Sequence, residues 1–277
     1  RWSNVKTALE GLSQIAEAPQ DTEPQRSYLR REKTAGGFEL RELQFCYPGN
    51  ESRVLDVPAL RILPGQTSAI LGSNGAGKST FLKVLSGLYA PTQGSVLLDG
   101  TDMAQLAAAD LRRFVGYLGP EVKLFSGSLR DNLNLNQLEN NGDRLQKALD
   151  FAGLGPFINS HSKGLDLPIT DGGQGLSSGQ RQSIGWARLW LQDPKVCLLD
   201  EPTAALDQTL ETTLISRLKS WLGGRTAIIA THRVGILSLT ERTMIFHNGR
   251  LATDGPRDAV LEHLKVSAAQ KNASGVV

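Results

Sequence analysis

The first part of the chain combines a helical hydrophobic period with a polar stretch. Residues 2–18 place apolar side chains three or four positions apart, which predicts an amphipathic helix that ends before Pro19. Residues 19–36 are polar, charged and interrupted by proline and glycine, which indicates a linker. The helix has no evident apolar partner within its own segment. We therefore expect it either to dock on the body of the protein or to continue a segment upstream.

From Phe38 the hydrophobic pattern changes to that of short strands. Three apolar runs separated by Pro-Gly turns predict the first strands, FELRELQFCY, ALRIL and TSAIL. Near the other end, Asn248–Gly249 predicts a β-hairpin, because Asn-Gly is a strong two-residue turn. A helix is expected to follow from Pro256, and from Val266 the polar sequence predicts a frayed tail.

The middle of the chain alternates strands with helices and then becomes rich in helices. Apolar strands are predicted at SVLL, 115–118, 196–200 and 226–230, with helical periods between several of them. Residues 128–160 predict three short helices, and another helix is expected from about Ser178 to Leu191. This order predicts an α/β protein whose core carries an antiparallel β subdomain and an inserted helical subdomain.

Composition narrows the class of protein. The 277 residues are 40% hydrophobic and 21% charged, as in an ordinary globular protein, and the formal net charge of +2 argues against nucleic-acid binding. Cys46 and Cys197 fit neither a metal site nor a redox motif, so a reduced cytosolic setting is expected. No apolar run approaches the roughly 18–20 residues that cross a bilayer, which predicts a soluble chain. Because it begins at Arg1 rather than methionine, we interpret it as a fragment.

One motif is far more specific than the rest. A short strand, a glycine-rich turn and a helix contain G-x-x-x-x-G-K-[ST], the P-loop, in which backbone N–H groups and the helix N-terminus receive phosphate oxygens. Lys78 is expected to reach the β- and γ-phosphates, and the Ser79 hydroxyl to bind Mg²⁺. An ordinary glycine-rich turn is the alternative, which the lysine and hydroxyl disfavour. The predicted nucleoside triphosphate site comprises Gly72, Ser73, Asn74, Gly75, Ala76, Gly77, Lys78, Ser79 and Thr80.

A second glycine-flanked helix start lies at residues 176–180, LSSGQ. Ser177 and Gln180 have the spacing of a capping box, and a helix N-terminus can also receive an anion. The spacing is explained equally well by a capped helix and by an anion site. Because the P-loop already cradles the phosphates, a second anion site would face the nucleotide of another subunit.

Two further strands end in residues suited to phosphate chemistry. VCLLD brings Asp200 to the carboxyl end of a buried strand, where α/β sheets bind ligands and where a carboxylate can hold Mg²⁺. Glu201 would lie beyond it and polarise the attacking water, the alternative being a surface acid. His232 follows the strand TAIIA. A lone histidine is usually structural, but this position favours the γ-phosphate side.

In order and spacing these motifs resemble the nucleotide-binding domain of ABC transporters over nearly the whole chain. GSNGAGKST resembles Walker A, VCLLD Walker B, LSSGQ the family signature and AALD (204–207) the D-loop. The resemblance implies an ABC ATPase fold with Lys78, Glu201 and His232 as catalytic residues. It also implies that Tyr47 in FCYPG stacks on adenine.

The resemblance assigns boundaries to the chain. Residues 1–18 would extend from a transmembrane domain, 19–36 would be the linker, and 37–265 the nucleotide-binding domain. Within it, the helical subdomain would span about 119–192, and residues 266–277 would be a flexible tail.

Several segments narrow the resemblance to bacterial type I secretion exporters, which move unfolded proteins. LFSGSLRDNL and DGGQGLSSGQRQ resemble exporters, and the N-terminal helix, the linker and HNGRLATDGPRDAVL resemble type I secretion exporters most. This implies an ATPase that binds ATP and Mg²⁺ at the cytoplasmic face of the inner membrane. The implied partners are a transmembrane domain of the same polypeptide, a membrane-fusion protein, an outer-membrane tunnel protein and an exported protein, but no nucleic acid.

A second copy of the chain is also an implied partner. In the family, two domains pair head to tail and enclose each nucleotide between one P-loop and the other subunit's signature. The residues that this implies on the second subunit are Ser177, Ser178, Gly179, Gln180 and Asp207.

Three positions depart from the family pattern. Ser178 replaces a more frequent glycine but keeps its backbone N–H, and Asp171 replaces a frequent glutamate. Pro120 stands where a glutamine usually binds Mg²⁺ and links the γ-phosphate to the helical subdomain. Proline offers no side-chain donor or acceptor. We expect either that Glu121 supplies the missing oxygen or that water does.

Two other functions are weighed against a transport ATPase. The missing glutamine is compatible with a degenerate cassette that binds ATP as a regulatory or structural clamp. A soluble cassette ATPase of DNA repair or translation is disfavoured, because the chain has neither coiled-coil nor tandem-cassette signals.

Overall fold

The computed structural model describes residues 27–50, 52–135 and 141–274, together with Lys6 and Ser13. Apart from those two residues, the predicted helix over residues 2–18 lies outside the described part, as does the first portion of the predicted linker. No helix within the described residues is long and apolar enough to span a bilayer.

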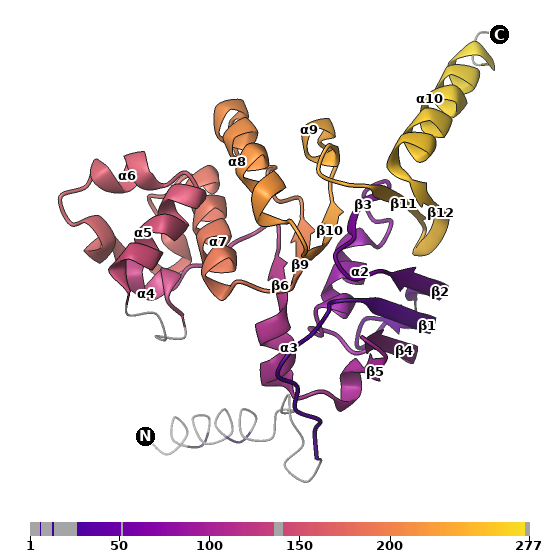
Figure 1. Cartoon of the computed structure of the whole chain (residues 1–277), viewed down its shortest axis with the longest axis horizontal. Coiled ribbons are helices and arrows are strands. Elements are labelled where there is room, and N and C mark those ends of the chain that lie inside the picture. The colour runs from indigo at the N-terminus through magenta and orange to yellow at the C-terminus, as the bar shows by residue number, and fades with distance from the viewer. Residues whose placement is uncertain (1–5, 7–12, 14–26, 51, 136–140, 275–277) are drawn as a thin grey trace.

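Three sheets form in the described residues, and Figure 1 shows the two larger ones side by side. The first is antiparallel, in the order β2-β1-β4-β5: β1 Phe38–Cys46, β2 Arg53–Ile62, β4 Gln93–Leu98 and β5 Thr101–Asp102. The second has the order β12-β11-β3-β10-β9-β6: β3 Thr67–Leu71, β6 Val115–Leu118, β9 Val196–Asp200, β10 Thr226–Ala230, β11 Arg242–His247 and β12 Arg250–Pro256. The third pairs β7 Gly127–Ser128 with β8 Pro168–Ile169.

The six-stranded sheet is the core that positions the site. All its neighbouring strands run parallel except β11 and β12, which form the predicted hairpin. Every residue of β9 and β10 is buried, as expected for central strands covered on both faces. The α/β core with an antiparallel β subdomain is therefore confirmed.

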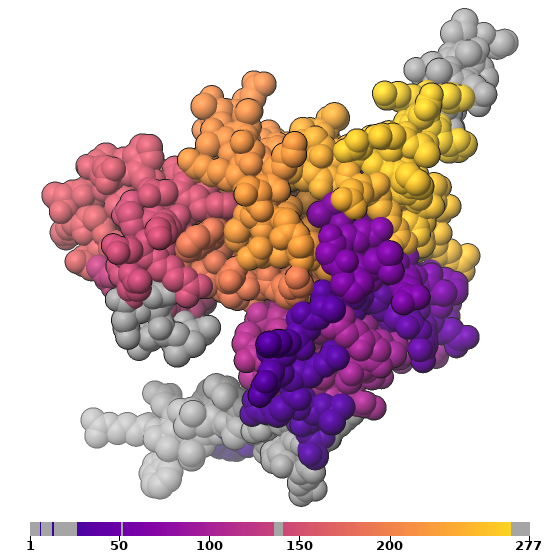
Figure 2. Space-filling model, viewed as in Figure 1, coloured from indigo at the N-terminus to yellow at the C-terminus, as the bar shows by residue number. Residues whose placement is uncertain are grey.

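Helices cover this sheet and also build a separate lobe. Four of them, with β7 and β8, form the lobe that projects from one side of the body, shown in pink and salmon in Figure 2. They share a hydrophobic cluster with the neighbouring face of the parallel sheet. The helices are α2 Lys78–Leu85, α3 Ala108–Phe114, α4 Leu129–Leu133, α5 Gly142–Phe151, α6 Gly155–Asn159, α7 Ser178–Gln192, α8 Gln208–Trp221, α9 Val234–Leu237 and α10 Arg257–Ser274. Short 3₁₀ turns lie at Met103–Gln105, Gly164–Asp166 and Asp171–Gly173.

Three elements differ from the sequence prediction. β2 begins at Arg53, six residues before the predicted strand ALRIL, and it tolerates Pro58 because it is an edge strand of its sheet. The short helix α9 was not predicted. α10 continues to Ser274, where a frayed tail was expected from Val266, since alanine, glutamine and lysine favour helix there.

The last part of the predicted linker is fixed to the body. Leu29 pairs with Leu106 in an isolated parallel bridge, and the Arg31 N–H donates to Asp110 over 2.9 Å. The Asp99 carboxylate accepts bonds from the Thr34 hydroxyl and from the N–H groups of residues 35–37. Burial alone would raise the pKa of Asp99, but these hydrogen bonds outweigh it and lower the pKa below its usual value. Residues 29–37 therefore lie along the protein surface.

Candidate functional site

The candidate site lies along one edge of the six-stranded sheet. β3, β10, β9 and β6 are parallel neighbours, so their carboxyl ends share that edge. The P-loop, Glu201, His232 and Gly119 follow these strands in the chain. The structure therefore brings together segments that are far apart in sequence, as α/β topology predicts.

The P-loop backbone depends on glycine at two close approaches. Gly72 has φ +154°, and a Cβ there would come within 2.3 Å of the Phe246 carbonyl oxygen. Gly77 has φ +97°, and its Cβ would come within 2.9 Å of Leu55. Both positions exclude larger residues, so the loop curls tightly against β11 and β2. α2 begins at Lys78, directly after this curl, with its free N–H groups at the loop.

Lys78 lies inside this curl. Its Nζ donates to the carbonyl oxygens of Gly72 and Ser73 over 2.7 and 3.1 Å, and lies 3.3 Å from Nε2 of His232. Burial lowers the pKa of Lys78, and the charges of Glu201 and Asp200 oppose that shift. A buried cation that faces the open loop is suited to phosphate oxygens.

Glu201 and His232 face each other across the ends of β9 and β10. His232 Nε2 lies 3.5 Å from Glu201 Oε1, and the His232 backbone N–H donates to Oε2 over 3.4 Å. Glu201 has φ +47° and donates its own N–H to the Ala230 carbonyl over 2.9 Å. The structure thus gathers Lys78, Glu201 and His232, the three predicted catalytic residues, beside Asp200.

Asp200 and Ser79 supply the protein oxygens suited to Mg²⁺. The Asp200 residue is 1% exposed, and its Oδ2 accepts a hydrogen bond from the Tyr117 hydroxyl over 3.3 Å. Burial, reinforced by Asp200, raises the pKa of Tyr117 above its usual value. The described residues contain no group of three or more metal-ligating side chains. A small number of protein ligands is typical of Mg²⁺ sites, because the ion is usually bound by one or two carboxylates together with substrate phosphates and water.

Tyr47 lies at the outer side of the P-loop helix. Its hydroxyl is 2.8 Å from the Thr80 hydroxyl, and its ring meets those of Phe45 and Tyr89 edge to face, with centroids 5.0 and 5.4 Å apart. The side chain is half-buried, so one part of the ring stays open. The stacking role on adenine stays a prediction.

The LSSGQ segment forms the predicted capping box. The Gln180 N–H donates to Ser177 Oγ over 3.1 Å, and the Ser177 N–H donates to Gln180 Oε1 over 2.8 Å. Ser177 and Ser178 are exposed. No hydrogen bond joins this turn to the P-loop in the part of the chain that the structure describes, and in Figure 1 α7 and α2 lie on opposite sides of β9. The capped helix is confirmed, and the anion site stays a prediction.

Asp207 and Glu121 have different surroundings. Asp207 caps α8, since its Oδ1 accepts the Leu210 N–H over 2.9 Å. Glu121 is exposed, and within the described residues it has no hydrogen bond or ion pair. The role of Glu121 as the missing Mg²⁺ ligand stays a prediction.

Sequence reasoning missed the side chains that hold the loop after β9. Gln182 is 2% exposed and bridges the loop, because its Nε2 donates to the Glu201 carbonyl over 2.9 Å and its Oε1 accepts the Ala205 N–H over 3.0 Å. The fully buried Trp186 donates its indole N–H to the Pro202 carbonyl over 2.8 Å. Both lie on α7. The sequence signal for these contacts was a glutamine on the apolar face of the predicted helix, which indicates a buried polar side chain that needs hydrogen-bond partners.

Two further side chains complete this support. Glu211 accepts a hydrogen bond from the Thr203 hydroxyl over 2.7 Å and pairs with Arg233 over 2.5 Å. Arg233 also donates to the Ala204 carbonyl over 3.0 Å. The residue after His232 is thereby linked to the AALD segment.

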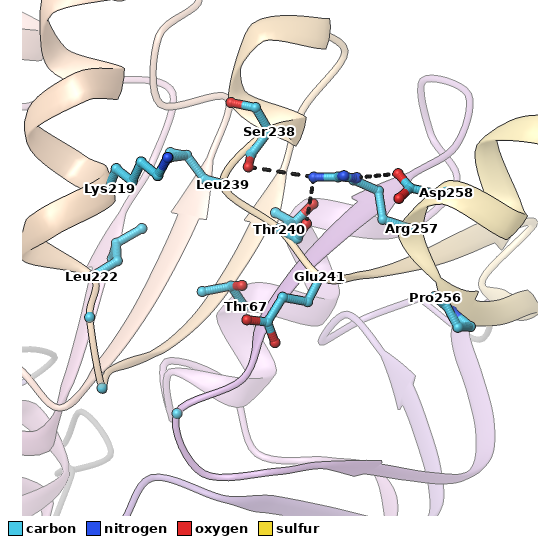
Figure 3. Close-up of a pocket in the computed structure, with 13 residues that line it drawn as sticks. Thr67, Lys219, Leu222, Ser238, Leu239, Thr240, Glu241, Pro256, Arg257 and Asp258 are labelled. Carbon is cyan, nitrogen blue, oxygen red and sulfur yellow. Dashed lines mark hydrogen bonds and ion pairs between the residues drawn. The ribbon is translucent and has the colours of Figure 1, made fainter.

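A pocket of about 510 Å³ lies at the other end of the sheet (Figure 3). It is lined by Thr67 at the start of β3 and by the ends of α8, α9 and α10. Its Arg257 is already engaged, with Asp258 and with the carbonyls of Ser238 and Thr240. It shares none of the predicted site residues.

Comparison with known proteins agrees with this geometry. The sequence profile of the family described as ABC transporter matches residues 55–204. The chain belongs to the ABC transporter family. It is an ATP-binding domain of this ATPase family.

Three relatives show the range of this ABC transporter ATP-binding domain. It is 30% identical over 268 residues to the uncharacterized ABC transporter ATP-binding protein YfiC of Bacillus subtilis, covering 94% of this chain and 44% of that protein. It is 34% identical over 226 residues to the cyclolysin secretion/processing ATP-binding protein CyaB of Bordetella pertussis, covering 82% and 32%. It is 31% identical over 245 residues to the ATP-dependent lipid A-core flippase of Xylella fastidiosa, covering 88% and 41%.

The domain spans less than half the length of these relatives. A solved structure of a bacterial Atm1-family ABC exporter with ATP bound superposes with a TM-score of 0.86 at 24% identity, covering 97% of this chain and 48% of that one. That likeness confirms the ABC ATPase fold.

Proposed function

We propose that this domain hydrolyses ATP with Mg²⁺ and powers a bacterial exporter of the type I secretion class, working as a head-to-tail pair. The observation that carries the proposal is the convergence of Lys78, Asp200, Glu201 and His232 on one sheet edge. The similarity to CyaB supports a protein substrate. The similarity to a lipid A-core flippase supports a lipid substrate as the alternative.

The residues divide the work of hydrolysis. Lys78 and the N–H groups at the start of α2 bind the triphosphate, and Ser79 and Asp200 hold the metal. When bound between these residues, Mg²⁺ would supply positive charge for the phosphate oxygens. Glu201 orients water for attack, and the nearby His232 contacts the γ-phosphate side. Positioning and charge supply most of the acceleration in such a reaction.

The geometry of α7 supports pairing with a second copy. Ser177 and Ser178 are exposed at a capped helix N-terminus and do not hydrogen-bond to the P-loop of their own chain within the described residues. A second subunit's nucleotide would meet this helix end, which favours anions. Each chain then contributes half of two sites.

The test is Glu201→Gln, which keeps the shape of the side chain and removes its charge. We expect phosphate release to fall by at least about a hundredfold, as for loss of a general base, while ATP still binds. Because ATP then persists, the variant should elute as a dimer with ATP in size-exclusion chromatography. Glu241→Gln, at the far end of the sheet, is the matched control and should behave like the unmodified chain.

Two results would contradict the proposal. If the unmodified chain binds ATP but releases no phosphate, the regulatory or structural cassette is the better function, and Pro120 would favour it. If Glu201→Gln stays monomeric with ATP, the head-to-tail pair is wrong. A transport assay with the full-length protein would distinguish a protein substrate from a lipid.

A further inference from the structure

A tyrosine on β6 contacts Asp200, although none of the recognised motifs contains it. β6 and β9 are parallel neighbours in the sheet (Figure 1). Tyr117 lies opposite Leu198, which places its ring within reach of the carboxyl end of β9. The Tyr117 hydroxyl donates to Asp200 Oδ2 over 3.3 Å. Among the described residues, no other side chain hydrogen-bonds to this carboxylate.

The packing around Tyr117 leaves a defined place for its hydroxyl. The ring is half-buried against the main hydrophobic cluster. A Cβ on Gly119 would come within 3.2 Å of the ring carbon Cε1 and 3.3 Å of the hydroxyl oxygen. Glycine at 119 therefore keeps the space beside the hydroxyl open, and a larger residue would press on it.

The residues that follow β6 do not make an equivalent contact. Pro120 has no side-chain donor or acceptor, and it is exposed. Glu121 is exposed too, and within the described ranges its side chain makes no hydrogen bond or ion pair. The segments that follow β3, β9 and β10 place the P-loop, Glu201 and His232 at the site. The contribution of β6 comes from Tyr117, a residue within the strand.

A neutral donor is well suited to a carboxylate that holds a metal. A buried carboxylate without a partner is costly, and a hydroxyl stabilises it without cancelling its charge. A lysine or arginine would neutralise the charge that attracts Mg²⁺. Hydrogen bonds to metal-binding carboxylates fix their orientation, and their loss weakens metal affinity.

We propose that Tyr117 is a positioning residue that orients Asp200 for Mg²⁺ from β6, the strand that leads to Pro120. The inference rests on the proposed function, because it concerns the same nucleotide site. It differs from the sequence expectation, in which Glu121 or water completes the metal site.

The experiment measures metal dependence of nucleotide binding in Tyr117→Phe, which removes only the hydroxyl. A fluorescent ATP analogue is titrated in EDTA and then at increasing Mg²⁺, and Mn²⁺ binding is followed by electron paramagnetic resonance. We expect the half-saturating metal concentration to rise about tenfold, as for loss of an outer-shell partner. Binding in EDTA should be unchanged, because no hydrogen bond joins Tyr117 to the P-loop within the described residues. Tyr28→Phe is the matched control, and it removes a hydroxyl from the linker.

A second variant guards against a general packing defect. Gly119→Ala keeps the tyrosine and displaces its hydroxyl, so it should shift the metal dependence in the same direction. Thermal unfolding without nucleotide checks that both variants fold. Unchanged metal dependence in folded Tyr117→Phe would overturn the proposal, and so would a shift in Glu121→Gln of the size expected for Tyr117→Phe. If the unmodified chain binds no analogue under any condition, the proposed function fails instead.

Discussion

Two loops leave the same edge of the parallel sheet and are held in opposite ways. The loop after β9, residues 201–206, is hydrogen-bonded along its whole length by side chains of α7 and α8, by Arg233 and by its own turns. The loop after β6, residues 119–126, has no hydrogen bond at residues 120–122 within the described structure. Hydrogen bonds hold it only at its far end, residues 123–125, whereas Val122 is held by apolar packing against the hydrophobic cluster of the helical lobe.

That far end is fixed by two side chains, the buried Asn132 and the partly buried Arg188, which bond to exposed residues of the loop. The Asn132 side chain exchanges hydrogen bonds with the backbone of Phe125, over 2.9 and 2.8 Å. Arg188 of α7 donates to the carbonyls of Lys123 and Asn132 over 2.8 and 2.6 Å. Burial lowers the pKa of Arg188 to about 10, which still leaves it charged at neutral pH.

Side chains of α7 form hydrogen bonds to both loops. Gln182 and Trp186 hold the loop that carries Glu201, and Arg188 holds the loop that follows β6. The loop with the predicted chemistry has a fixed geometry. The loop that resembles the family's link to the membrane domain has no hydrogen bond at residues 120–122 in the described structure, where the packing of Val122 holds it. Any shift of α7 reaches both.

The largest expected effect comes from freeing the first loop. Gln182→Leu leaves the Glu201 carbonyl and the Ala205 N–H unpaired in a buried site, at a cost of about 1–3 kcal/mol of unfolding free energy. Misplacing Glu201 should also lower kcat about tenfold or more. Urea denaturation and steady-state phosphate release measure the two effects.

Gln192→Leu is the matched control for that variant. It makes the same substitution at the other end of α7, where the Gln192 side chain donates to the carbonyls of Arg112 and Val115 and does not hold the first loop. Its loss of activity should therefore be smaller. Equal activity in Gln182→Leu and the unmodified chain would mean that the first loop keeps its geometry without this bridge.

Much of the candidate site could be predicted because its motifs are local. A P-loop or a capping box is complete within a few residues, so spacing alone identifies it, and the structure contains the Ser177–Gln180 box as predicted. The contacts of Gln182, Trp186 and Tyr117 depend on which strands and helices are neighbours. No local pattern contains that information.

The same reasoning explains the errors in the fold. β2 was predicted too short, because Asp56 and Pro58 interrupt its apolar pattern, and only its place at the sheet edge makes them acceptable. Glu121 was selected for its proximity in sequence to Pro120. Its side chain lies at the surface, whereas Tyr117, three residues before Pro120, points toward Asp200.

An intermediate effect is expected from releasing the second loop. Asn132→Ala removes the bonds to Phe125, but that segment is exposed and water can replace part of them, so the loss should be about 1 kcal/mol. Cleavage after Phe125 by a protease specific for aromatic residues should become faster. Phosphate release by this domain should stay near its original rate. A large fall in phosphate release would show that the two loops are not independent.

The smallest effect is expected at the start of the second loop. Pro120→Gln restores the side chain usual in the family and should cost about 0.4–1 kcal/mol, because the unfolded chain gains freedom. If Tyr117 already orients Asp200, the Mg²⁺ requirement should change less than about twofold, below the usual range for outer-shell partners. Phosphate release titrated with Mg²⁺ measures this. A large gain in phosphate release in Pro120→Gln would show that the unmodified second loop lacks a side chain needed for catalysis.

The attachment of residues 29–37 has a mechanical consequence. Leu29 is bridged to Leu106, and Asp99 holds the backbone of residues 35–37 at the β4–β5 turn. Because these contacts join residues 29–37 to the β4–β5 turn and to α3, a force on this segment would act directly on both elements.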